Sequence, residues 1–158
     1  MKLEEKVVKK LKEKNLILAT AESCTGGLIA KRITDVSGSS SVFECGIVSY
    51  SNRIKNEILG VRTETLEKYG AVSEECAREM VNGLLKVSGA DIGVAVTGIA
   101  GPCSDGTNKP VGLVYIAFSD GKDVVVKKYL NEFDDNIREN NRKKSADEAL
   151  KMVLEYFV

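Results

Sequence analysis

The stretch LILATAESCTGG, residues 16–27, sets the fold class of this chain. It opens with LILATA, a short apolar run typical of a buried β-strand, and ends with AESCTGG, whose small residues suit a tight turn. A helical pattern resumes at Leu28 and lasts to Val36. A buried strand that passes through a turn into a helix is the repeating unit of α/β sheets. The sequence therefore predicts an α/β domain.

The same two patterns recur on both sides of this unit. Helical periodicity and capping residues mark helices at residues 2–14, 51–59, 64–69, 73–87 and from 137 onward. Short apolar runs mark strands at residues 42–49, 92–96, 111–118 and 124–130. The turn SDGK joins the last two strands as a hairpin. This order predicts a three-layer α/β/α fold with a mixed, roughly five-stranded sheet, and the length fits a single domain over residues 1–158.

Histidine is absent from the whole sequence. Its absence removes the Ser-His-Asp triad, the Cys-His dyad and any His-ligated zinc site. The four cysteines are too scattered for a CxxC pair and fit free thiols in a reducing compartment: Cys24, Cys45, Cys76 and Cys103. We therefore expect no metal and no organic cofactor, and any catalysis must use lysine, tyrosine, carboxylates, hydroxyls, thiols, arginine or backbone groups.

The charges are balanced, with 23 Lys and Arg residues against 23 Asp and Glu residues. A nucleic-acid-binding protein would show a basic excess, because phosphate neutralisation drives its affinity. Residues 1–15 alternate charged and aliphatic side chains and lack the apolar core of a signal peptide, and no apolar run is long enough to cross a bilayer. We expect a cytoplasmic protein without nucleic-acid or membrane partners, and a homodimer because symmetric dimers are the commonest assembly.

Candidate chemistry lies in three segments that each leave a predicted strand through small residues, where ligands of open α/β sheets bind. The first is AESCTGG, which puts Ser23 at a strand-to-helix turn. Free N–H groups at the helix start would stabilise a serine alkoxide and a developing oxyanion. The alternative is that Ser23 and Thr25 only cap the helix.

The second segment is YSNRIK, residues 50–55, and the third is TGIAGP, residues 97–102, which continues to KPVG at 109–112. In a chain without histidine, a buried lysine with a lowered pKa is a candidate general base, and Lys55 stands about one helical turn into its helix. The alternative is a surface lysine. The glycines of the third segment would let a ligand approach the backbone, although they match neither a phosphate-binding nor a dinucleotide-binding fingerprint and could form only a structured turn.

Together, AESCTGG, YSNRIK followed by LGV, GAVSEE, TGIAGP and KPVG resemble the C-terminal domain of the CinA family in order and spacing. The resemblance covers the chain from about residue 2 to its end. The activity known for members of this family is that of a nicotinamide-nucleotide amidase. Longer CinA proteins carry an additional N-terminal domain, which we expect to be absent here because of the length of this chain. The resemblance implies hydrolysis of the carboxamide of nicotinamide mononucleotide, a small nucleotide, to nicotinate mononucleotide and ammonia.

The resemblance also implies roles for individual residues. Ser23 matches the nucleophile of the family, Lys55 its partner base and Tyr50 a tyrosine beside them, while Thr97 matches a threonine that contacts the substrate. The small residues of the same segments are expected to contact the substrate as well: Thr25, Gly26, Gly27, Gly98 and Gly101.

Two arginines near the last helix are the expected phosphate ligands. The family usually has a GDR turn there, with a second arginine one helical turn later. Here the stretch reads NIRENNR, so Arg138 and Arg142 keep the spacing, but Ile137 replaces the acidic residue. The loop at residues 103–105 also departs from the glycines often found there.

Two other interpretations stay open at the level of sequence. The domain could keep the fold and only bind a nucleotide or a partner, because fold alone does not fix activity. Alternatively, Cys24 could be a thiol nucleophile, although no histidine is available to activate it.

Overall fold

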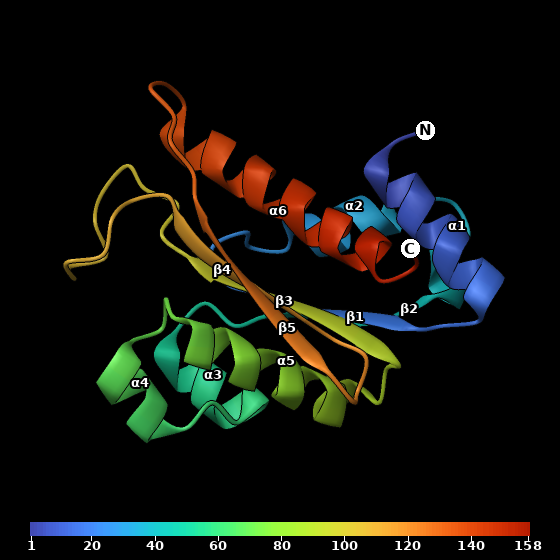
Figure 1. Cartoon of the computed structure of the whole chain (residues 1–158), viewed down its shortest axis with the longest axis horizontal. Helices are drawn as coiled ribbons and strands as arrows, with labels where there is room; N and C mark the ends of the chain where they lie inside the picture. Colours follow the sequence, from blue (N-terminus) through green and yellow to red (C-terminus); the bar gives the residue numbers. More distant parts are fainter.

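A single five-stranded sheet in the order β2-β1-β3-β4-β5 forms the centre of the computed structural model, which describes residues 1–158 (Figure 1). The strands are β1 (Leu18–Glu22), β2 (Phe43–Val48), β3 (Ile92–Gly98), β4 (Leu113–Ser119) and β5 (Val124–Leu130). β1 runs parallel to both β2 and β3, whereas β4 is antiparallel to β3 and β5. The predicted mixed sheet and its final hairpin are therefore confirmed.

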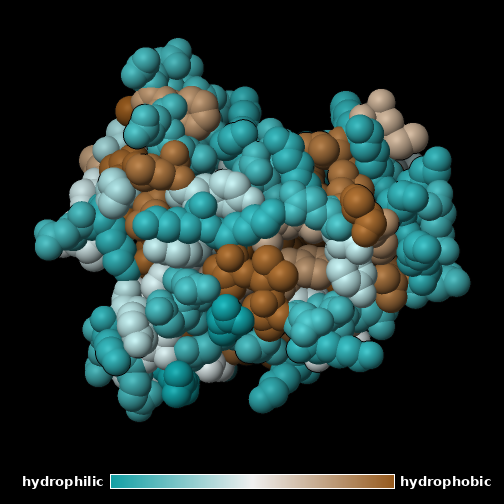
Figure 2. All heavy atoms as spheres, in the orientation of Figure 1, coloured by the Kyte–Doolittle hydropathy of each residue, from teal (hydrophilic) through white to brown (hydrophobic).

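Helices cover both faces of this sheet (Figure 1). One layer contains α1 (Leu3–Lys14), α2 (Leu28–Thr34) and α6 (Ile137–Glu155), and the other contains α3 (Asn52–Leu59), α4 (Thr63–Tyr69) and α5 (Glu74–Ser88). Each layer has its own apolar core, of 20 and 11 buried residues. In Figure 2 the outer atoms are mostly hydrophilic, and hydrophobic atoms show mainly where the layers meet. The three-layer α/β/α prediction is confirmed.

Helix ends follow the capping residues that the sequence displays. Asn15 ends α1 in a left-handed conformation with φ of 52°, and Gly60 ends α3 with φ of 70°. The Ser73 hydroxyl accepts the Cys76 N–H at the start of α5. One difference concerns Thr97 and Gly98: the sequence predicts a loop there, but both residues belong to β3, since they pair with β4.

Gly83 sets how closely α5 approaches α3. A Cβ atom at position 83 would lie 1.7 Å from the Leu59 carbonyl oxygen at the end of α3. We predict that Gly83→Ala lowers the free energy of unfolding by roughly 2 kcal/mol, because overpacking outweighs the gain of about 1 kcal/mol in helix propensity. Urea denaturation measures this change. Asn82→Ala, on the exposed side of the same helix, is the control and should be neutral; equal stability of the two variants would contradict the prediction.

Candidate active site

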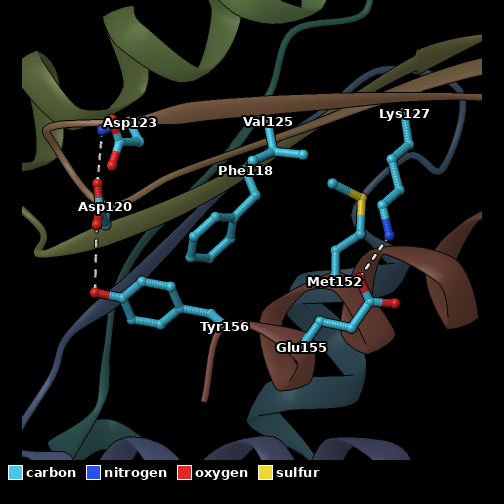
Figure 3. A pocket seen from close by; sticks show the side chains of 8 residues that line it. All are labelled: Phe118, Asp120, Asp123, Val125, Lys127, Met152, Glu155 and Tyr156. Carbon is cyan, nitrogen blue, oxygen red and sulfur yellow. Dashed lines mark hydrogen bonds and ion pairs between the residues drawn. The ribbon is translucent and has the colours of Figure 1, made fainter. Parts of the chain in front are cut away.

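A cavity of about 280 Å³ lies between the β4–β5 turn and the end of α6 (Figure 3). Phe118 contributes to its apolar lining, and three of its four charged side chains have partners: Lys127 pairs with Glu155, and Asp120 accepts the Tyr156 hydroxyl. None of the candidate residues lines it. It therefore does not hold the site that the sequence motifs predict.

The larger cleft, of about 690 Å³, lies at the carboxyl ends of β1 and β3. From β1 the chain turns to β2 on one side, and from β3 it turns to β4 on the other. Ligands of open α/β sheets bind at such a switch point, and a volume of several hundred Å³ suits a small nucleotide. The walls come from the turn after β1, the start of α3, the α4–α5 loop, the loop after β3 and the start of α6.

Ser23 and Lys55 meet inside this cleft. The Lys55 Nζ atom lies 3.1 Å from the Ser23 Oγ atom, and it also donates to the carbonyl oxygens of Ser49, at 2.9 Å, and Tyr50, at 3.3 Å. Ser51 caps α3 by accepting the Ile54 N–H, which places Lys55 one turn into the helix. Lys55 is only 1% exposed. The alternative of a surface lysine is therefore excluded.

Burial lowers the pKa of Lys55, because the ammonium loses its hydration and no Asp or Glu side chain forms an ion pair with it. The contacts of Nζ suit a neutral amine. Nζ lies within donor distance of three oxygens, those of Ser23, Ser49 and Tyr50. In the neutral amine, two N–H groups can serve the two carbonyls, which leaves the lone pair to accept the hydroxyl proton of Ser23. The arrangement thus holds a serine beside a base.

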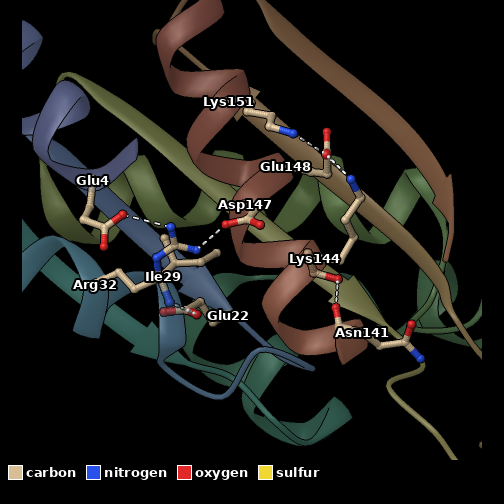
Figure 4. Close-up of polar contacts among 10 residues, drawn as sticks. Glu4, Glu22, Ile29, Arg32, Asn141, Lys144, Asp147, Glu148 and Lys151 are labelled. Atoms are coloured by element: carbon tan, nitrogen blue, oxygen red, sulfur yellow. Dashed lines mark hydrogen bonds and ion pairs between the residues drawn. The ribbon is translucent and has the colours of Figure 1, made fainter. Parts of the chain in front are cut away.

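The start of α2 is not free to bind an anion. The carboxylate of Glu22 accepts the N–H group of Ile29 at 2.8 Å (Figure 4) and that of Ala30 at 3.0 Å. The expectation that these helix-start groups stabilise the alkoxide is therefore wrong. The N–H groups without an acceptor in the chain belong to the turn itself, at Cys24, Thr25 and Gly27. Glu22 was missed because its partners lie seven and eight residues away; a charged residue within a small-residue turn was the available signal.

Contacts at both ends fix α2, the helix that follows the turn at residues 23–27, here called the Ser23 turn. Glu22 holds its first turn, and near its end Arg32 pairs with Glu4 of α1, at 2.8 Å, and with Asp147 of α6, at 2.6 Å (Figure 4). The Ser23 N–H donates to the Val96 carbonyl of β3. Ser23 therefore sits on a segment held to three other elements.

Tyr50 contacts Lys55 through its backbone and not through its phenol. Its hydroxyl accepts a hydrogen bond from Arg138 Nη2 at 2.8 Å, and Arg138 Nη1 donates to the Gly101 carbonyl at 2.8 Å. Arg138 thereby bridges two rims of the cleft, and all three residues line it. The tyrosine ring is 60% exposed at the mouth. A direct part for the phenol in catalysis stays a prediction.

Thr97 and Lys109 fasten the loop between α4 and α5, which forms one wall. The Thr97 hydroxyl donates to the Ala71 carbonyl at 2.9 Å, and Lys109 Nζ donates to the carbonyls of Tyr69 and Val72. Thr97 lines the cleft at the end of β3, as does Gly98. The tethering part of Lys109 could not be inferred from the sequence, because its acceptors are backbone atoms about 40 residues away.

Arg142 contacts the Ser23 turn on the side away from the cleft. Its Nη2 atom donates to the Thr25 carbonyl at 2.9 Å, and a Cβ atom at Gly26 would lie 3.1 Å from the same nitrogen. Arg142, Thr25, Gly26 and Gly27 do not line the cleft. Substrate contact by these four residues stays a prediction, and their placement gives it no support.

Cys24 is a poor nucleophile in this structure. It lines the cleft beside Ser23, but it is 6% exposed, and burial raises the pKa of its thiol to about 12. The thiolate is the reactive form of cysteine. The site therefore favours the Ser23 hydroxyl over the neighbouring thiol.

Elsewhere in the fold, no helix combines the length and apolar character that crossing a membrane requires.

Fold and site together define a class of α/β proteins with a buried serine–lysine pair at the switch point of a mixed sheet. A family profile described as the CinA C-terminal domain matches residues 1–157. The chain belongs to the CinA C-terminal domain family, as the sequence motifs predicted.

Relatives and solved structures agree with this assignment. A protein of Thermoanaerobacter sp. (strain X514), described as competence-damage inducible, is 51% identical over 156 residues, which is 99% of this chain and 37% of the relative. The chain thus spans little more than a third of that relative. The competence/damage inducible protein CihA from Agrobacterium tumefaciens has a structure with a TM-score of 0.92 at 41% identity, covering 97% of this chain and 92% of that chain. The structure of the competence damage-inducible protein A (ComA) from Klebsiella pneumoniae has a TM-score of 0.92 at 35% identity, covering 97% of this chain and 93% of that chain.

Proposed function

We propose that the chain hydrolyses the carboxamide of nicotinamide mononucleotide to nicotinate mononucleotide and ammonia. The observation that carries the proposal is the 3.1 Å contact between Ser23 Oγ and the nitrogen of a lysine that is 1% exposed. A buried lysine with a lowered pKa can act as a general base near neutral pH, which the absence of histidine otherwise prevents. The family resemblance supplies the substrate class.

The reaction needs only groups of this chain and water. Neutral Lys55 takes the hydroxyl proton as Ser23 Oγ attacks the carboxamide carbon, and the resulting oxyanion is held by the free Cys24 N–H beside Ser23. The Lys55 ammonium then protonates the leaving nitrogen, and ammonia departs from an acyl-enzyme. A water molecule, deprotonated by Lys55, attacks the acyl carbon, and the returning proton restores the Ser23 hydroxyl as the carboxylic acid leaves.

An ammonia-release assay on the purified protein tests this function directly. The expected result is one ammonia and one nicotinate mononucleotide for each nicotinamide mononucleotide consumed. Binding of the mononucleotide, seen by calorimetry, without release of ammonia would contradict the proposal. That result would favour a domain of the same fold that only binds nucleotides.

Of the two candidate arginines, Arg138 is the one that lines the cleft, so we assign it to the substrate phosphate. An arginine donates two parallel hydrogen bonds to a phosphate, and losing such a charge-assisted contact costs about 1.5–3 kcal/mol, or roughly 10- to 100-fold. Arg138→Ala should reduce kcat/KM for the mononucleotide by this factor and leave slow turnover of the dephosphorylated riboside nearly unchanged.

Arg142→Ala is the matched control for this prediction, because Arg142 donates to the Thr25 carbonyl outside the cleft. Its effect should be the same on the mononucleotide and the riboside. Equal losses on both substrates for Arg138→Ala, or a phosphate-specific loss for Arg142→Ala, would contradict the assignment.

A further inference from the structure

Glu22 is a buried carboxylate that the Ser–Lys chemistry does not use. It ends β1, is 1% exposed, and forms no ion pair with a lysine or arginine. Its two oxygens instead accept the N–H groups of Ile29 and Ala30. Burying a carboxylate without a cation is costly, and an apolar residue would suit a strand with five buried positions better. A contribution to stability alone therefore does not explain why a carboxylate is present at position 22.

Glu22 contacts both sides of the Ser23 turn, through its carboxylate and through its backbone carbonyl. It starts one residue before Ser23 and reaches the first turn of α2, whose own N-cap, Gly27, provides no side-chain acceptor. The Glu22 carbonyl accepts the Ser49 N–H at 2.8 Å, and the Ser49 carbonyl accepts from Lys55 Nζ at 2.9 Å. One residue thus connects the turn that carries the nucleophile to the group that orients the base.

The same carboxylate determines which N–H groups remain for an oxyanion. With Ile29 and Ala30 occupied, the N–H groups without acceptors are those of Cys24, Thr25 and Gly27, and of these residues Cys24 lines the cleft with Ser23. The candidate oxyanion donor is therefore an N–H group of the turn, that of Cys24, and not one of the N–H groups in the first turn of α2.

We propose that Glu22 is a positioning residue for Ser23: by holding the first turn of α2, its carboxylate fixes Ser23 Oγ against Lys55 and leaves the Cys24 N–H as the oxyanion donor. This inference rests on the proposed function for its effect on turnover. Its effect on the reactivity of Ser23 is independent of the substrate, so the two can fail separately.

Glu22→Gln tests the inference, because it keeps the size of the side chain and puts an NH₂ group against one of the helix N–H groups. We expect kcat for ammonia release to fall about 10- to 100-fold with little change in KM, since a misplacement near 1 Å can cost about 10²-fold. The rate at which a fluorophosphonate labels Ser23, with loss of fluoride, should fall by a similar factor, and mass spectrometry of the labelled peptide follows it.

Glu79→Gln is the matched control. The Glu79 carboxylate also accepts a backbone N–H, from Arg62 at 2.9 Å, and a hydroxyl, from Thr65 at 2.6 Å, but it lies outside the cleft. This variant should lose thermal stability and keep wild-type turnover and labelling. A Glu22→Gln variant that behaves in the same way would assign Glu22 to stability and overturn the inference.

A second variant covers the case in which Glu22→Gln does not fold. Glu22→Asp keeps the charge but is one methylene shorter, so it should fold and still label Ser23 more slowly than the wild type. If neither variant folds, or if Glu22→Asp labels at the wild-type rate, the inference is overturned. A wild-type protein that releases no ammonia, but whose labelling slows in Glu22→Gln, would overturn the proposed function alone.

Discussion

Ser23→Ala should reduce ammonia release from nicotinamide mononucleotide on the order of 10⁴-fold or more, because loss of a serine nucleophile removes the acyl-enzyme route. The fold should be unaffected. The lost hydroxyl bonds only to Lys55, which keeps its two carbonyl acceptors, Ser49 and Tyr50. A continuous ammonia assay, together with circular dichroism of the same sample, measures both effects.

Cys24→Ala is the control for this substitution, because Cys24 lines the cleft beside Ser23 and its Sγ atom is the alternative nucleophile. Its thiol has a pKa raised to about 12 by burial, so it carries almost no thiolate at neutral pH. The variant should keep most of its activity. If Cys24→Ala abolished ammonia release and Ser23→Ala preserved it, the nucleophile would be the cysteine.

Lys55→Met should reduce kcat about 10²- to 10⁴-fold, the range typical for the loss of a general base. Methionine keeps much of the length of the side chain and fills the same buried space, but it cannot accept a proton. The wild-type enzyme should show kcat/KM rising with pH as Lys55 loses its proton, with a midpoint below the usual lysine pKa of about 10.4 because burial lowers it. The rising limb should be missing from the residual activity of the variant.

The same lowered pKa makes the stability of the protein depend on pH. Below the folded-state pKa of Lys55, the ammonium is present in both states, and the folded chain bears the full cost of burying it. Between the folded and unfolded pKa values, the unfolded chain binds more protons, so stability rises with pH. The free energy of unfolding of the wild type relative to Lys55→Met should therefore increase as the pH rises towards the usual lysine pKa of about 10.4. Urea denaturation across this range measures it, and a difference independent of pH would show that Lys55 does not change its charge on folding.

Local signals explain why most of the fold could be predicted. Caps such as Asn15, Gly60 and Ser73 act within a few residues of the helix ends that they define, and the apolar runs match the strands. The start of β1 was placed two residues early, at Leu16 and not Leu18. Ile17 is apolar, but its N–H bonds to the Asp91 carboxylate outside the sheet ladder, a contact 74 residues away that no local pattern reveals.

The same difference between local signals and contacts across long sequence distances applies to the site. Ser23 and Lys55 could be predicted because each stands in a motif beside the end of a strand, and their meeting follows from the parallel pairing of β1 and β2. The partners of Arg142 and Arg138 could not, because both arginines bond to atoms contributed by distant segments, 117 residues away for Arg142 and 88 for the Tyr50 hydroxyl. The sequence shows that the two arginines lie one helical turn apart, but this spacing does not distinguish a side chain that lines the cleft from one behind the Ser23 turn.

The proposed nucleophile and the proposed base belong to layers on opposite faces of the sheet. Ser23 leads into α2, in the layer with α1 and α6, whereas Lys55 belongs to α3 in the other layer (Figure 1). Neither half of the molecule holds a working pair by itself. Under the proposed function, we therefore expect a nascent or partly refolded chain to release no ammonia until the helices of both layers have packed against the sheet. After dilution from denaturant, the return of ammonia production would report that last docking event, later than the recovery of helical signal.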